Sequence, residues 1–238
     1  MTVSYSRKVA TTTLGTFARL LFRWKGSIYR LLYREMVMYL TLYYFVCIIY
    51  QFALSEHARR KFEEWSLFCQ KYTDLVPLTF VLGFYVSMII GRWWNIFSSL
   101  TWPDKICFMV QSLVGGHDER GRMVRRTVAR YINLAQVLVL RDISSAVRKR
   151  FPTLEILVES GFLTDDEYKQ FESIEMTHHK FWVPLQWTCS LLTKARKEGL
   201  IDTDPSLVKM IEEVIQCRNS LMSLICYDWI SVPLVYTQ

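Results

Sequence analysis

Two long uncharged stretches, residues 36–54 and 75–91, dominate the hydrophobic pattern of the chain. As a helix, the first would be about 28 Å long, close to the hydrocarbon thickness of a bilayer. The alternative is a helix buried in a soluble core, which the length of the run disfavours. The second stretch contains Pro77, Gly83 and hydroxyl side chains, a composition typical of a span packed against protein. The pattern therefore predicts two transmembrane helices.

From residue 92 onward the pattern changes to shorter segments with helical spacing. Met123, Thr127, Tyr131, Leu134 and Leu138 recur every three or four positions, the spacing of one helix face. Local signals mark further helix ends: Pro103 before a helix that a glycine pair closes, a capping box at Thr164, and Asp204 as an N-cap before Pro205. No segment alternates with a period of two, so we expect no sheet. The predicted fold class is all-α.

These patterns divide the chain into six segments. The last of them is apolar apart from Asp228 and is expected to begin a third membrane segment, which suggests a fragment or a short form of a longer protein. In order, the segments are a cytosolic or interfacial stretch (1–35), transmembrane helix 1 (36–54), an extracellular loop (55–74), transmembrane helix 2 (75–91), a cytosolic helical region (92–225) and the start of a third membrane segment (226–238).

The placement of charge orients the two predicted spans. The segment 55–74 has balanced charge, and basic residues resume at Arg92. By the positive-inside rule the N-terminus is cytosolic, 55–74 is outside, and the chain then returns to the cytosol. We therefore expect a multi-pass membrane protein, with lipid and not nucleic acid as the partner of its +7 net charge. Its expected location is the plasma membrane. Residues 1–34 carry no acidic residue, and their charged side chains are Arg7, Lys8, Arg19, Arg23, Lys25, Arg30 and Arg34.

Two basic patterns keep two interpretations each. Residues 14–32 mix apolar and basic side chains, which fits an amphipathic helix at the cytosolic membrane surface or a packed helix leading into the first span. Arg122, Arg126 and Arg130 recur every four residues. Such a row is ordinarily a solvated or salt-bridged helix face, and the alternative is an electropositive lining that concentrates anions.

Signatures of catalysis are missing from the sequence. The six cysteines form no CxxC pair, and no phosphate loop or nucleophile elbow occurs. His178 and His179 are adjacent, which suits a surface or hydrogen-bonded pair better than a metal site. Neighbouring carboxylates fall on amphipathic segments, where solvation is the ordinary state. We therefore predict that the protein is not an enzyme.

The second span carries an apolar stripe formed by Val76, Phe80 and Phe84, which are spaced four residues apart. Such a stripe is ordinarily a packing or lipid-facing surface. The functional interpretation is a hydrophobic neck that gates a pore by dewetting, built from several copies around an axis. Helix N-termini and ring edges favour anions, so Pro77, Thr79 and Gly83 are candidates for an anion pathway.

Short motifs along the whole chain resemble those of the bestrophins, a family of calcium-activated anion channels. Each motif is brief, but their order and spacing make coincidence implausible. They are Gly26-Ser27-Ile28-Tyr29, Phe80-Val81-Leu82-Gly83-Phe84-Tyr85-Val86, Arg92-Trp93-Trp94-Asn95, Trp102-Pro103-Asp104, Arg150-Phe151-Pro152, Tyr227-Asp228-Trp229-Ile230 and Pro233-Leu234-Val235-Tyr236-Thr237-Gln238.

The resemblance implies a homopentamer with one central pore, chloride as a permeant ion, and a neck at Val76, Phe80 and Phe84. It also implies regulation by calcium through the backbone carbonyl of Ala10, with acidic ligands from a region that this chain does not contain. One carbonyl does not replace an oxygen cage of about six or more ligands, so calcium binding by this chain alone is doubtful. Family members have four spans and often an apolar lower constriction, where this sequence has Pro205.

The leading functional hypothesis is a subunit of a calcium-activated chloride channel whose pore has a hydrophobic neck. The alternative is a non-conducting truncated form that co-assembles with, or regulates, full-length channel subunits. A membrane-bound enzyme is a third possibility, for which the sequence offers no polar catalytic cluster.

Overall fold

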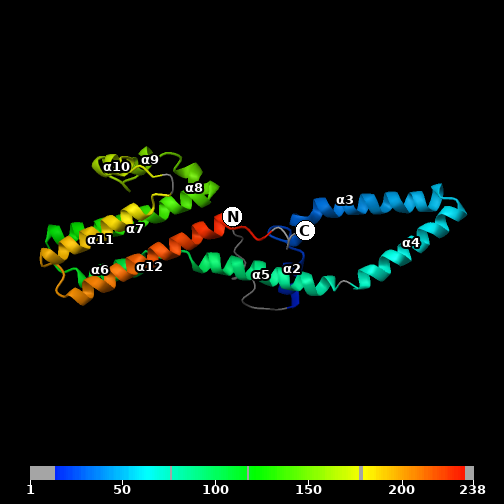
Figure 1. The fold of residues 1–238 in the computed structure, drawn as a ribbon, viewed down its shortest axis with the longest axis horizontal. Coiled ribbons are helices and arrows are strands. Elements are labelled where there is room, and N and C mark those ends of the chain that lie inside the picture. Colours follow the sequence, from blue (N-terminus) through cyan, green and yellow to red (C-terminus); the bar gives the residue numbers. More distant parts are fainter. Residues whose placement is uncertain (1–13, 76, 117, 177–178, 234–238) are drawn as a thin grey trace. The chain divides into compact units, whose positions relative to one another are not determined.

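The computed structural model describes residues 14–75, 77–116, 118–176 and 179–233. Within these ranges the chain is helical and contains no strand, which confirms the all-α prediction (Figure 1). The chain divides into two compact units, Met1–Leu78 and Thr79–Gln238, which we describe separately.

The first unit consists of α2 (Leu14–Leu21), α3 (Ile28–Ile48), a π-helical turn η1 (Ile49–Ala53) and α4 (Glu56–Leu75). The hydroxyl of Ser27 caps α3 by accepting a hydrogen bond from the backbone N–H of Arg30. The helix thus starts eight positions before the predicted span. Its first turn is set by the Ser27 cap and not by the residue at which the uncharged run begins. Together α3 and η1 form a candidate membrane span by length and composition.

The segment predicted as an extracellular loop forms the helix α4. It contains good helix formers and no glycine or proline, and Leu54 adopts the extended conformation that separates it from η1. The turn is held by Arg59, whose guanidinium donates to the carbonyl of Tyr50 at 3.2 Å, and by the Tyr50 hydroxyl, 2.5 Å from a carboxylate oxygen of Glu63. The extracellular placement of α4 stays a prediction.

The second unit begins at the second residue of α5 (Leu78–Ser98), and Thr79–Ser98 form the other candidate span. The helix continues past Gly91, where the uncharged run ends. Arg92 is part of the helix, and its guanidinium donates hydrogen bonds to the backbone carbonyls of Tyr227 and Ile230. The remaining helices are α6 (Asp104–Leu113), α7 (Glu119–Ile143), α8 (Ser145–Arg150), α9 (Glu155–Glu159), α10 (Asp165–Glu172), α11 (Trp182–Lys197) and α12 (Asp204–Trp229).

The core of the second unit lies between α7, α11, α12 and α6, and α11 runs antiparallel to its neighbours α7 and α12 (Figure 1). Its fully buried side chains come from each long helix, with Ile132 and Leu134 on α7, Leu192 on α11 and Leu221 on α12. Removing this apolar surface from water is the main favourable term for the fold of the unit. The predicted cytosolic region is therefore helical, as the periodicity indicated.

The helix ends of this unit test the local signals. The capping box at Thr164 is present, and Pro103 precedes α6 as predicted. At α12 the N-cap is Thr203 and not Asp204: the Thr203 hydroxyl accepts from the N–H of Ser206. Thr203 has the extended backbone that a cap requires, while Asp204 pairs with Arg196 at 2.7 Å.

The predicted third membrane segment falls partly on α12. Residues 226–229 form the last turn of this helix, with Cys226 half-buried, and residues 234–238 lie outside the described ranges. The assignment of 226–238 to a membrane stays a prediction.

Candidate functional site

The predicted neck lies near the start of α5, where Phe80 and Phe84 share one helix face. Their ring centroids are 4.7 Å apart at an interplanar angle of 79°, an edge-to-face pair. Both side chains are 63% exposed, so neither contributes to the core of its own unit. Val76 lies outside the described residues. Two of the three predicted neck residues are thus shown to form a continuous, exposed aromatic surface.

The geometry of this pair restricts what it can do chemically. An edge-to-face contact is worth about 0.5–1.5 kcal/mol, so each ring limits the rotamers of the other. Phenyl rings offer no hydrogen-bond donor or acceptor to a hydrated ion, but their edges carry partial positive charge. Facing its own copies, such a surface would repel bulk water and interact weakly with an anion, as a hydrophobic gate does.

The predicted anion-pathway residues lie beside this pair. Pro77 is exposed and directly precedes α5, and Thr79 and Gly83 occupy a neighbouring stripe about 100° round the helix from the phenylalanines. A Cβ added to Gly83 would meet no other heavy atom within 4 Å. Packing within the chain therefore does not require a glycine at this position. A glycine here would allow the backbone of another molecule to approach α5 closely.

At its other end, α5 is joined to α12 through Arg92, a contact that the sequence analysis missed. The guanidinium donates to the backbone carbonyls of Tyr227 and Ile230, the latter at 2.7 Å, and lies 5.3 Å from the ring centroid of Tyr227. The cation thereby satisfies carbonyls at the negative end of α12. The sequence motifs that contain Arg92 and Tyr227 were both recognised, but no local pattern indicates that these two residues are in contact.

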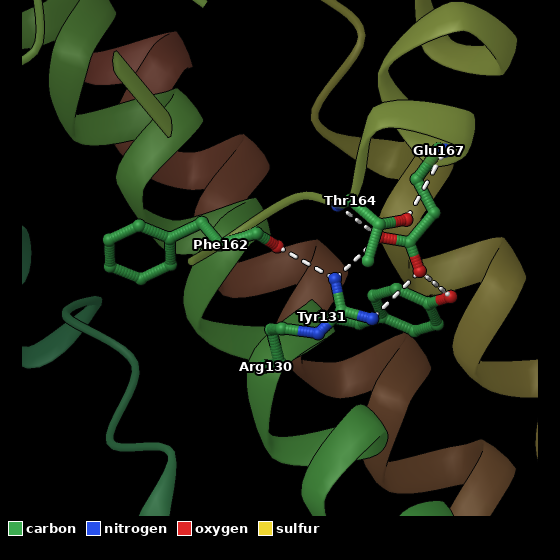
Figure 2. Close-up of polar contacts among 5 residues, drawn as sticks. All are labelled: Arg130, Tyr131, Phe162, Thr164 and Glu167. Atoms are coloured by element: carbon green, nitrogen blue, oxygen red, sulfur yellow. Dashed lines mark hydrogen bonds and ion pairs between the residues drawn. The ribbon is translucent and has the colours of Figure 1, made fainter. Parts of the chain in front are cut away.

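A polar cluster links α10 to α7 and contains Arg130, the last residue of the arginine row (Figure 2). Its guanidinium binds both carboxylate oxygens of Glu167, at 2.5 and 2.7 Å, and the carbonyl of Phe162 at 3.0 Å. The Tyr131 hydroxyl donates to Glu167 at 2.6 Å, and the N–H of Thr164 donates at 2.9 Å. For Arg130 the salt-bridged interpretation is therefore correct.

The cluster shifts the titration of its members. Burial by itself raises the pKa of Glu167, but hydrogen bonds from Arg130, Tyr131 and the Thr164 backbone outweigh it and lower the pKa to about 2. Burial, and then the hydrogen bond to Glu167, raise the pKa of Tyr131 to about 12. Both side chains keep a fixed charge state at neutral pH, which suits a structural clamp. Arg122 and Arg126 are exposed and remain candidates for an electropositive surface.

Of the two adjacent histidines, His179 is hydrogen-bonded to an ordinary carboxylate partner. His179 lies with Nδ1 2.6 Å from a carboxylate oxygen of Asp142 and with its ring 5.4 Å from that of Trp229. His178 lies outside the described residues. In the part of the chain that the structure describes, no three or more His, Cys, Asp or Glu side chains are grouped to hold a metal. Ala10, the predicted calcium contact, lies outside the described ranges, so calcium binding stays a prediction.

Comparison with known proteins gives one family. Residues 1–238 match the sequence model described as "Bestrophin, RFP-TM, chloride channel". The chain is 47% identical to human Bestrophin-3 and 46% identical to human Bestrophin-1, covering 36% and 41% of those relatives. It is 45% identical to mouse Bestrophin-2 and covers 47% of that protein. In all three cases the whole chain is aligned, so it spans less than half the length of the relatives that it matches.

Proposed function

The chain belongs to the bestrophin family, and on this premise we propose that it is a membrane subunit of an anion channel in which α5 faces the conduction pathway. The observation that carries the proposal is the exposed Phe80–Phe84 pair on a helix long and apolar enough to span a bilayer. Chloride is the proposed permeant ion, in agreement with the description of the family model.

The proposed gate is a hydrophobic neck formed by Val76, Phe80 and Phe84. A narrow apolar passage expels water, so an ion crosses it only when the passage widens or wets. Thr79 and Gly83 lie on the adjacent stripe, where a hydroxyl and a side-chain-free backbone offer weak polar contacts to an anion that has lost part of its hydration. The neck itself uses no metal, cofactor or catalytic group.

A pore of this kind requires several copies of the chain. A single α5 cannot enclose a passage, whereas copies related by a rotation axis each contribute one helix. The family resemblance implies five copies, and the charge pattern predicts a cytosolic N-terminus. The plasma membrane is the proposed location. Calcium regulation is proposed only for an assembly that supplies the acidic ligands, because the described residues of this chain offer no such group.

The test replaces Phe80 and Phe84 by alanine, with Val76→Ala added, in channels containing this chain and recorded by patch clamp. Loss of the aromatic neck should raise the current in low calcium several-fold, since the barrier to wetting falls. Leu82→Ala with Val86→Ala is a matched control, because both residues are exposed apolar side chains on the opposite face of α5. Gating unchanged by the neck variants, or changed equally by the control, would refute the neck.

The second candidate function is a non-conducting subunit that co-assembles with, or regulates, full-length relatives. Within the described residues the chain has two membrane-length helices, fewer than the four spans that the family resemblance implies. Expressing the chain alone and together with human Bestrophin-3 separates the candidates. Current from the chain alone supports the channel, whereas absence of current with co-purification supports the regulatory subunit.

A further inference from the structure

We propose that the segment from α2 to the start of α3, residues 14–27, is a binding surface for the headgroups of anionic phospholipids, and we call it the α2 elbow. The inference goes beyond the proposed function, because it concerns a lipid site and does not depend on ion conduction. It decides between the two interpretations that the sequence left open for this region.

The α2 elbow has an exposed apolar surface. Phe17, Leu21 and Trp24 are each about half exposed or more, and Phe22 is 88% exposed. These side chains are not buried against their own unit, so water, lipid or another molecule must cover them. Four large apolar residues within eight positions instead match a helix whose apolar face enters the boundary between headgroups and acyl chains.

Cations flank this apolar surface and have no acidic neighbour in the sequence. Arg19 lies on α2 on the side away from Phe17 and Leu21, and Arg23 and Lys25 follow in the turn. Among the described residues, the ion pairs join positions from Lys105 onward, so these three cations are in none of them. Residues 1–34 contain no Asp or Glu. The α2 elbow is therefore a cationic surface without an acidic partner among the described residues, which suits an anionic ligand.

The turn between α2 and α3 is ordered by the chain itself. Gly26 adopts a φ of 85°, and the N–H and hydroxyl of Ser27 donate to the carbonyl of Trp24 at 3.3 and 2.8 Å. The ring of Trp24 also lies 6.0 Å from that of Tyr33 on α3. These contacts hold Lys25 three residues, and Arg23 five residues, before the first residue of the candidate span. If α3 crosses the bilayer, the cations lie at headgroup depth.

Charge complementarity selects anionic lipid among the molecules that could cover this surface. Two copies meeting elbow to elbow would bring like charges into contact, which opposes association. Phosphatidylserine and other acidic lipids carry phosphate or carboxylate groups at the cytosolic face, where each nearby Lys or Arg strengthens binding about fivefold. Arg and Lys donors suit those oxygen acceptors, and the four apolar side chains suit the acyl region below them.

The test uses the full chain in nanodiscs of phosphatidylcholine alone, and of phosphatidylcholine and phosphatidylserine at about three to one. Hydrogen–deuterium exchange reports on residues 14–27, and native mass spectrometry counts the phosphatidylserine molecules retained. The variant is Arg19→Gln, Arg23→Gln and Lys25→Gln. The control is Arg122→Gln, Arg126→Gln and Lys209→Gln, which removes the same charge from exposed positions of the second unit. Protection of α3 in both lipids verifies insertion.

We expect exchange in the α2 elbow to slow when phosphatidylserine is present, and the elbow variant to lose this effect together with at least about tenfold of its preference for that lipid. The control should keep both. Equal exchange in the two lipids, or an unchanged preference in the elbow variant, would overturn the proposal. Protection that appears in phosphatidylcholine alone and rises with protein concentration would also overturn it, because it would place a second copy of the chain on this surface.

Discussion

The guanidinium of Arg92 donates to the backbone carbonyl of Ile230 at 2.7 Å, joining residues that are 138 positions apart. The same group also binds the carbonyl of Tyr227. Arg92 thus connects the proposed pore helix α5 to the last turn of α12, and α12 is a core helix of the second unit. A displacement of the end of α12 would therefore act directly on α5.

The first prediction concerns this connection. Arg92→Gln should lower the free energy of unfolding of the detergent-solubilised chain by about 1–2 kcal/mol, because charge-assisted hydrogen bonds to two carbonyls are lost. Thermal unfolding followed by circular dichroism measures the change. Arg126→Gln is the control, since Arg126 is exposed and its replacement should leave the transition within experimental scatter. Equal stability of the two variants would show that Arg92 does not hold the helices together.

The second prediction is a dependence on acid. The pKa of Glu167 is about 2 in the folded protein, below its ordinary value of 4.5. Because the folded-state pKa is depressed, this carboxylate stabilises the fold fully above pH 4.5 and loses that effect as the pH falls toward 2. Urea unfolding at several pH values should therefore show a steeper loss of stability in the parent than in Glu167→Gln. Glu175→Gln, at an exposed position, should retain the parental slope.

The third prediction tests the start of α10. The Thr164 hydroxyl accepts a hydrogen bond from the N–H of Glu167, so Thr164→Ala should cost about 1 kcal/mol of stability. Faster amide exchange confined to α10 would localise the effect. Thr193→Ala serves as the matched control, because that hydroxyl donates to the carbonyl of Cys189 within its own helix and caps nothing. A loss of the same size in both variants would argue against a specific capping role.

The fourth prediction uses native cysteines to test orientation. Cys69 is exposed on α4, and burial raises the pKa of Cys217 to about 11. A membrane-impermeant maleimide added to intact cells should therefore label Cys69, if α4 is extracellular, and leave Cys217 unmodified. The label should disappear in Cys69→Ser. Labelling of Cys69 only after permeabilisation would place α4 in the cytosol and reverse the proposed topology.

The sequence predicted those features of the fold that depend on nearby residues. Helical periodicity located α7, and the Thr164–Glu167 spacing located the start of α10. At α12 two adjacent residues, Thr203 and Asp204, both suit an N-cap, and only the backbone conformation separates them. The helix α4 escaped prediction because its balanced charges conceal the apolar positions and make it resemble a polar loop.

Contacts between distant residues were beyond sequence reasoning. The aromatic stripe of α5 was predicted because Phe80 and Phe84 are four positions apart, and the structure places their rings in contact. Arg130 and Glu167 are 37 positions apart, and nothing in either local sequence selects the other as its partner. The arginine row could therefore be interpreted as a solvated face, a salt bridge or an anion-attracting surface until packing assigned Arg130.

The helix α3 contributes no buried residue, whereas Leu134, Leu192 and Leu221 on the long helices of the second unit are wholly enclosed by their own chain. A map of mutational tolerance should consequently have two regimes. Polar substitutions at the enclosed leucines should be rejected in any host that makes the chain, because folding itself fails. The effect of substitutions along α3 should depend on the lipids and other subunits that contact this helix. Their tolerance should therefore vary with the cell type and the expression level chosen for the screen.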